Sequence, residues 1–160
     1  MTPLTFVAKL ALSGAGWQPD SRDDERARRL HLALATHRSP HGFAHTVHPM
    51  AVDAWAHYGA LRVEQDGPGE ELALRTFSFD PLEAIHTAYG CAAFGELLGH
   101  AVTPLGSVRD GEAFLLIDDT GRVFSRDHTG DWFLGPDVNA AINTLAAGSA
   151  FVRVREDGTW

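Results

Sequence analysis

The stretch from Gly99 to Gly135 constrains the fold more than any other part of the chain. Short apolar runs alternate there with turn residues, and the turns fall at Asp110-Gly111 and at Asp119-Thr120-Gly121. Apolar runs separated by short turns that contain Asp and Gly predict an antiparallel meander. The same stretch holds no recognisable catalytic set, so it favours a scaffold that presents a surface to a partner.

Helical and extended patterns flank this stretch on both sides. Capping residues and apolar spacing predict helices over residues 2–14, 21–39, 50–58, 80–98 and 137–147, with Thr2 and Ser21 as the first two N-caps. Alternation predicts strands at 61–64 and 72–79, and an edge strand or a tail at 151–160. Together these elements predict a single α+β domain over residues 1–160. Its mostly antiparallel, mixed sheet of about six strands carries N-terminal, middle and C-terminal helices.

The formal net charge of −8 is distributed unevenly. Residues 64–119 contain eleven acidic side chains against two arginines, whereas residues 1–38 carry a small positive excess. A negative field of this kind repels nucleic acid and attracts cationic partners. The alternative is that the acidic residues serve only solubility.

The cysteine content and the N-terminus bear on the compartment. Cys91 is the only cysteine, so no intramolecular disulfide forms and a reducing compartment fits best. Residues 1–11 lack the basic start of a signal peptide, and Lys9 interrupts their apolar run. No stretch approaches the roughly 20 apolar residues of a membrane span. The sequence therefore predicts a cytoplasmic protein without a membrane partner.

Four of the nine histidines raise the question of a metal site. His37, His41 and His45 are spaced by four residues, with His48 close by. On one helix, two of these side chains would chelate zinc. A proline and a glycine break the helical pattern, however, and no cysteine or acid completes a familiar ligand set. The pattern therefore favours a polar, flexible surface loop, and no metal or cofactor is expected.

Candidates for catalysis are few. Cys91 lies among small residues of a predicted helix, which favours a packing role over a nucleophilic one. Asp127-His128 beside Asp131 would form an acid–base pair, but the predicted hairpin loop favours solvated polar side chains. Neither a nucleophile elbow nor a phosphate-binding glycine loop occurs. We expect no catalytic residue and therefore no enzyme.

The tryptophans differ in their predicted surroundings. Trp17 follows a Gly-Ala-Gly run and is expected to fill a corner between two helices. Trp132 continues a predicted strand and is expected in the core. Trp160 is the last residue given, so disorder or a weak contact is expected there.

Short motifs along the chain resemble a known family when they are taken in order. They are Ala15-Gly-Trp-Gln-Pro19 with Arg22, Tyr58-Gly-Ala-Leu61, Phe79-Asp-Pro81, Leu98-Gly99, Pro104-Leu-Gly106, Leu116-Ile-Asp118, Gly121-Arg-Val-Phe124 and Trp132-Phe-Leu-Gly135. Their order and spacing resemble the third group of the SUKH superfamily of bacterial immunity proteins, from about Leu12 to Gly148. Two departures are Ala60, where that group has a second glycine, and the histidine-rich stretch 37–48.

The resemblance implies an α+β fold and a non-catalytic role. Immunity proteins of this superfamily bind and neutralise toxin domains of polymorphic toxin systems, often nucleases or nucleic-acid deaminases. An acidic surface suits such a target, because enzymes that hold phosphates are basic. The candidate toxin contacts are the acidic residues of the middle segment and its turns: Glu64, Asp66, Glu70, Glu71, Asp110, Glu112, Asp118 and Asp119.

Two other readings stay open at the level of the sequence. One is a regulatory or scaffolding module that binds a different protein through the same sheet. The other is a small hydrolase that uses Asp127-His128 or a metal at the histidine-rich stretch. The oligomeric state is also open between monomer and homodimer, because residues 151–155 would be able to pair across a dimer edge. No direct binding of nucleic acid is expected.

Overall fold

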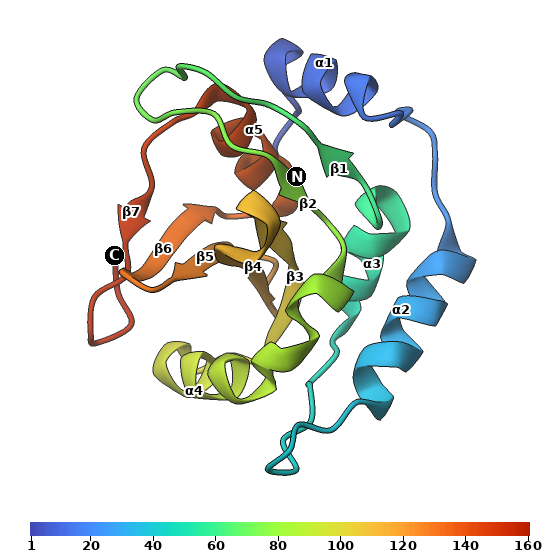
Figure 1. Cartoon of the computed structure of the whole chain (residues 1–160), viewed down its shortest axis with the longest axis vertical. Helices are drawn as coiled ribbons and strands as arrows, with labels where there is room; N and C mark the ends of the chain where they lie inside the picture. Colours follow the sequence, from blue (N-terminus) through green and yellow to red (C-terminus); the bar gives the residue numbers. More distant parts are fainter.

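A computed structural model describes residues 1–160 and contains one seven-stranded sheet (Figure 1). Each strand pairs antiparallel with the next strand along the chain, so the spatial order follows the sequence. The strands are β1 (Arg62–Val63), β2 (Phe77–Ser78), β3 (Val102–Val108), β4 (Ala113–Asp118), β5 (Val123–Asp127), β6 (Gly130–Gly135) and β7 (Val152–Arg153). The predicted α+β class and the meander are confirmed. The sheet is antiparallel throughout rather than mixed, and it has seven strands rather than about six.

The register of the meander shifts at two places, on β3 near Gly106 and between Val123 and Phe124 on β5. The register of β3 against β4 shifts between Pro104 and Gly106. A Cβ atom at Gly106 would overlap the carbonyl oxygen of Ser78 on the neighbouring strand. Only glycine allows the two backbones to approach this closely, which gives the glycine of the Pro-Leu-Gly motif a structural reason.

Helices precede, interrupt and follow the strands. They are α1 (Phe6–Gly14), α2 (Asp24–Thr36), α3 (Pro49–Tyr58), the 3-10 helix η1 (Pro81–Thr87), α4 (Ala88–Leu98), the short 3-10 helix η2 (Arg109–Gly111) and α5 (Val138–Ala147). Two predicted N-caps are wrong, because the side chains of Thr5 and Asp23 cap α1 and α2 in place of Thr2 and Ser21. Thr2 instead donates to the Asp137 carboxylate at the start of α5. The predicted helix over 80–98 is divided into η1 and α4.

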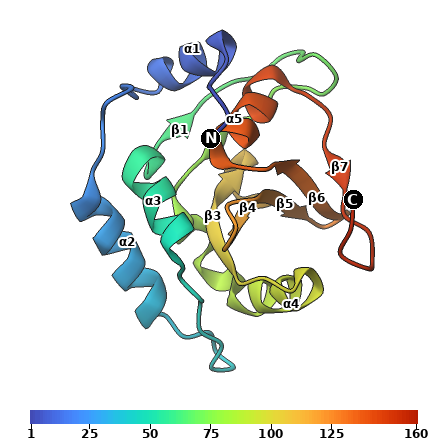
Figure 2. The ribbon, with the colours of Figure 1, turned by 180° about the vertical axis from the view of Figure 1, so that it is seen from behind.

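The sheet separates two apolar clusters of unequal size. The larger cluster joins α1, α2, α3 and α5 to one face, with Trp55, Ile117 and Ile142 fully buried. The smaller cluster joins α4 to the opposite face through Phe94 and Phe124. Figures 1 and 2 show α4 apart from the other helices, across the strands of the meander.

The aromatic side chains follow the predictions only in part. Trp17 stacks on Tyr58 with 6.0 Å between ring centroids, as expected for a packing residue. Trp132 is half-buried rather than core, since it lies beside the two-residue edge strand β7 and under the Arg153 guanidinium. Trp160 is not disordered: it stacks on Phe133 at 4.6 Å and covers the smaller cluster.

Candidate functional site

The acidic residues at one end of the sheet are joined to arginines. The Arg62 guanidinium contacts the carboxylates of both Glu64 and Asp110, and Arg109 lies 3.3 Å from Glu112. The hydrogen bond from Arg62 holds the pKa of Asp110 below its ordinary value. All five side chains are exposed. These carboxylates therefore lie on the surface with most of their charge balanced by a neighbour.

The two acids of the β4–β5 turn have opposite surroundings. Asp118 is fully buried, accepts hydrogen bonds from the backbone and hydroxyl of Thr120, and pairs with Arg122 at 2.6 Å. Asp119 is exposed and accepts a 2.8 Å hydrogen bond from His100, which lowers the carboxyl pKa. Asp118 is accordingly not a surface carboxylate: it organises the turn, and a partner cannot reach it.

Residues 64–76 form a strap that turns back on itself between Pro68 and Ala73 and lies alongside the C-terminal end of α5 (Figures 1 and 2). The backbone N–H of Glu70 donates to the Ala147 carbonyl oxygen, and that of Glu71 donates to Gly148, both at 2.9 Å. The predicted strand over 72–79 is therefore limited to Phe77–Ser78, because the N–H of Leu72 donates to Gly148 and that of Leu74 donates to Gly67 within the strap. Glu64 pairs with Arg62, whereas the other three exposed carboxylates of the strap form no ion pair: Asp66, Glu70 and Glu71.

A cavity of about 260 Å³ lies between the strap, the end of α5 and the sheet. Its wall is mainly apolar and includes Leu72 of the strap, Leu145 of α5, Trp132 of β6, and Val108 and Phe151. The polar groups of the wall include Asp127 and Arg75. Sequence reasoning missed this cavity, because its residues come from separate segments and share no motif.

Two histidines of the histidine-rich segment are buried and make specific contacts, although the composition of the segment predicts an exposed loop. His45 and His48 are buried, and each contacts a backbone carbonyl oxygen through Nε2: Ile85 at 2.6 Å and Ile117 at 3.0 Å. Burial lowers the pKa of both imidazoles. The expectation of a surface loop is therefore wrong for these two residues. No group of three or more potential ligands is placed to hold a metal ion.

The acid–base candidates of the β5–β6 hairpin are engaged separately. Asp127 accepts hydrogen bonds from the backbone and hydroxyl of Thr129, and Asp131 pairs with Arg126 at 2.8 Å. Burial raises the pKa of Asp131, whereas hydrogen bonds outweigh burial and lower the pKa of Asp127. His128 is exposed. The three side chains therefore do not form a relay, and Asp127 serves the turn.

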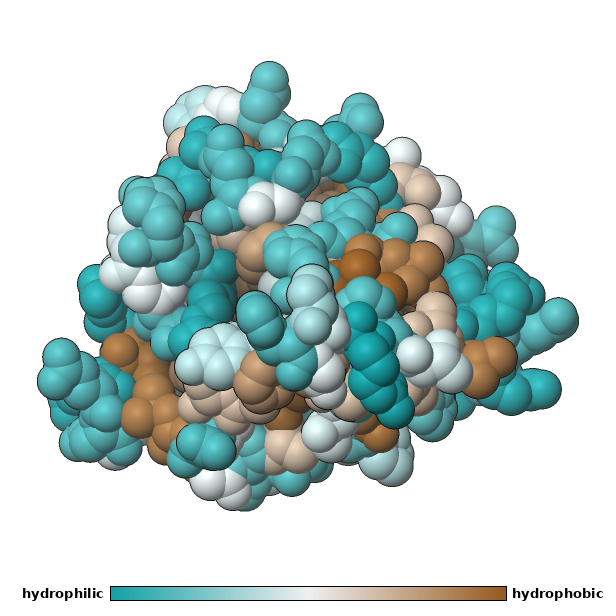
Figure 3. Space-filling model, turned by 60° about the horizontal axis from the view of Figure 1, so that its bottom comes forward, coloured by the Kyte–Doolittle hydropathy of each residue, from teal (hydrophilic) through white to brown (hydrophobic).

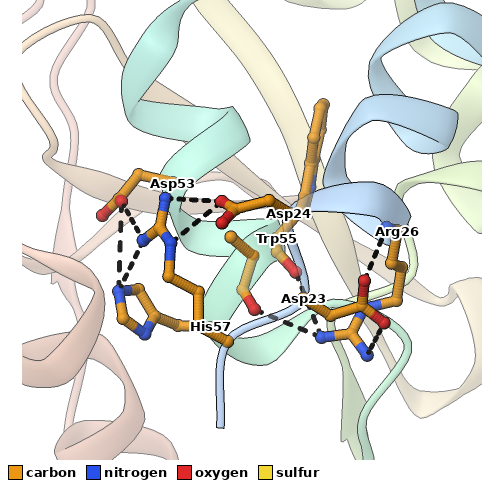
Figure 4. A network of polar contacts seen from close by, with 8 residues as sticks. Asp23, Asp24, Arg26, Asp53, Trp55 and His57 are labelled. Carbon is orange, nitrogen blue, oxygen red and sulfur yellow. Dashed lines mark hydrogen bonds and ion pairs between the residues drawn. The ribbon is translucent and has the colours of Figure 1, made fainter. Parts of the chain in front are cut away.

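The motif arginine of the N-terminal segment holds two helices together. Arg22 contacts Asp24 at the start of α2 and Asp53 on α3, both within 2.8 Å, and lies 3.0 Å from the His57 ring. Figure 4 shows Asp53, His57 and Asp24 converging on this guanidinium, next to the pair formed by Asp23 and Arg26. Arg22 of the N-terminal motif therefore has a structural role, because it joins α2 to α3.

Apart from the strap, the face that carries α4 also exposes apolar side chains. There they form separate patches divided by hydrophilic residues (Figure 3). Tyr89 of α4 is 64% exposed but contacts Phe43 edge-on at 4.9 Å. Burial raises the pKa of Cys91 to about 11, which fits the predicted packing role. This face contributes no acidic cluster to the candidate surface.

None of the helices has the length and apolar character needed to span a membrane.

Comparison with known proteins identifies the family. No curated protein and no solved structure matches the chain. The family model described as SUKH-3 immunity protein matches residues 7–148, which includes the meander, the strap and the Arg22 network. The chain therefore belongs to the SUKH-3 immunity protein family, which is non-catalytic and whose role implies toxin neutralisation.

Proposed function

We propose that this protein neutralises one cognate toxin domain by stoichiometric binding in the cytoplasm. The observation that carries the proposal is the family match over residues 7–148. We further propose that the target is a nuclease or a nucleic-acid deaminase, because both hold a polyanion in a basic cleft. An acidic surface competes for such a cleft and speeds association through steering.

The strap supplies the free negative charge of the proposed surface. Asp66, Glu70 and Glu71 have no cationic partner, whereas Glu64, Asp110 and Glu112 pair with arginines and Asp119 accepts a hydrogen bond from His100. A neighbouring arginine offsets the field of its carboxylate, so a paired acid attracts a cationic partner less than a free one does. We therefore place the strongest toxin contacts on the strap, and assign the paired acids a weaker role at the rim.

The test is co-expression with the toxin domain encoded beside this chain's gene. We expect growth rescue and co-purification at 1:1 stoichiometry. Failure of both would favour the alternative of a regulatory or scaffolding module with a different partner.

Charge reversal tests the surface. A variant with Asp66→Lys, Glu70→Lys and Glu71→Lys is expected to associate at least about tenfold more slowly at low salt. A control with Asp20→Lys, Glu96→Lys and Glu156→Lys changes the net charge equally, at exposed positions outside the strap. Stopped-flow association at several salt concentrations gives both rates. Equal rates for the two variants would contradict the placement on the strap.

A further inference from the structure

The cavity under the strap is walled on three sides by fixed elements. The strap is bonded to α5 at Glu70, Glu71 and Leu72, whose N–H groups donate to carbonyl oxygens at 2.8–2.9 Å. Gly69 and Gly148 lie so close that a Cβ atom on either would approach the other's Cα to 2.7 Å. The cavity is therefore preformed, so a ligand entering it does not have to order the strap.

The size and lining of the cavity indicate what it accepts. Its volume of about 260 Å³ falls below the roughly 300–1,000 Å³ of pockets that hold whole small molecules. Leu72 at its rim is 40% exposed, so it presents apolar surface at the mouth of the cavity. The cavity wall is formed in part by Leu145, Trp132 and Phe151. An apolar side chain that packs against them is removed from water, which favours binding.

The charges around the cavity restrict what flanks that side chain. Asp66, Glu70 and Glu71 belong to the strap that borders the cavity, and Asp127 lies in its wall. Arg75 is the one cationic side chain of the lining. Basic residues on either side of an apolar anchor would meet opposite charge, whereas acidic ones would be repelled.

We propose that this cavity receives a single apolar side chain from a basic segment of the toxin. The inference rests on the proposed function and deepens it, because it names the anchor and the chemistry around it. Interface hot spots are anchors in desolvated pockets, surrounded by contacts that exclude water. The strap then has two roles: its carboxylates attract the segment, and Leu72 packs against the anchor.

The first experiment tests the cavity without the toxin. The probes are the acetylated, amidated peptides Lys-Lys-Leu-Lys-Lys, Lys-Lys-Ser-Lys-Lys and Glu-Glu-Leu-Glu-Glu. Binding is followed by the NMR shift of the Trp132 indole N–H, which belongs to the cavity wall. We expect the basic leucine peptide to bind about tenfold more tightly than the serine peptide. Equal binding of these two, or equal binding of the acidic peptide, would overturn the inference.

The second experiment uses the toxin and fills the cavity from its rim. The variants are Ala73→Trp and Ala150→Trp. Both alanines line the cavity and are exposed, so a tryptophan at either position is expected to fill the cavity at little cost to folding. Ala93→Trp, exposed on α4, is the matched control. Unfolding midpoints confirm that each variant folds. We expect both cavity variants to weaken toxin binding at least tenfold while the control binds as the unchanged protein does.

The outcomes separate this inference from the proposed function. If the unchanged protein binds the toxin and both cavity variants bind equally well, the anchor is wrong and toxin neutralisation stands. If the unchanged protein binds no toxin, the proposed function is wrong, and the toxin cannot be the source of the apolar side chain. Peptide selectivity then still shows whether the cavity prefers a basic apolar segment.

Discussion

At the scale of single residues, Ala60 has the backbone of a glycine. Its φ is 64°, in the left-handed region, and its N–H donates to the Phe79 carbonyl oxygen. An L-residue in this region costs roughly 1–2 kcal/mol relative to the right-handed helix region. Ala60 is also the position where the sequence departs from the aromatic-Gly-Gly-Leu motif of the family it resembles. The departure therefore stores backbone strain and leaves the fold unchanged.

Ala60→Gly is expected to stabilise the protein by about 0.5–1 kcal/mol. The gain is the relief of the left-handed strain, reduced by the greater backbone entropy of glycine in the unfolded chain. Urea unfolding measures it. The control is Ala93→Gly on the exposed side of α4, which should cost about 1 kcal/mol as glycine does within helices. Destabilisation by both substitutions would show that Ala60 is not strained.

Neighbouring residues also show where the sequence stops being informative. Asp118 and Asp119 both belong to a turn that the sequence predicts correctly, and either one suits a surface role by type. Only the packed structure separates them, because Asp118 is directed to Arg122 across the turn and Asp119 to His100. The four-residue spacing of Asp118 and Arg122 is the one local signal of that pair.

At the scale of elements, α3 begins on a histidine. His48 Nδ1 accepts a hydrogen bond from the Ala51 N–H, and the opposite nitrogen, Nε2, lies 3.0 Å from the Ile117 carbonyl oxygen. This pairing requires the neutral ring with its proton on Nε2, since a protonated Nδ1 cannot accept. Burial accordingly lowers the pKa of His48 from 6.5. The cap of α3 depends on a neutral imidazole, because only an unprotonated Nδ1 accepts the hydrogen bond from Ala51.

His48→Asn is expected to make stability less dependent on pH. Because the folded pKa lies below the unfolded value, the unfolded chain takes up a proton first, and stability falls as pH drops below about 6.5. One such proton changes the free energy of unfolding by at most about 1.4 kcal/mol per pH unit. Asparagine still caps a helix but does not titrate.

Urea unfolding at pH 7.5, 6.5 and 5.5 measures this dependence. The exposed His41 serves as the control, and His41→Asn should keep the full pH dependence of the unchanged protein. A His48→Asn variant whose stability falls just as steeply would assign the loss to other groups, such as His45.

The elements that sequence patterns predict best are those with local signals. The meander, α3 and α5 follow from turn residues, caps and periodicity. The strap does not, because the backbone bonds of Glu70 and Glu71 go to the last residues of α5, far away in the sequence. The buried His45 and His48 were missed for the same reason: their partners, Ile85 and Ile117, come from distant elements. The acidic residues of the candidate surface were visible in the sequence, whereas their pairing and the cavity were not.

At the scale of the whole molecule, the sheet is covered unequally on its two faces. The larger cluster is surrounded by four helices, whereas α4 is the one α-helix that packs on the smaller one. The C-terminal segment completes that smaller cluster. Trp160 stacks on Phe133, meets Phe124 edge-on at 5.5 Å and lies 5.2 Å below the Arg122 guanidinium. Since Arg122 also pairs with the buried Asp118, the segment is linked to the β4–β5 turn.

Trp160→Ala is therefore expected to destabilise the whole protein by about 2 kcal/mol. The loss combines two aromatic pairs, each worth roughly 0.5–1.5 kcal/mol, with a cation–π contact of roughly 0.5–1 kcal/mol, reduced by the partial exposure of the ring. Urea unfolding measures the change. Phe6→Ala is the control, because Phe6 is 77% exposed and should shift stability by no more than about 0.5 kcal/mol. Equal stability of the two variants would mean that the smaller cluster is complete without Trp160, and that α4 alone seals this face of the sheet.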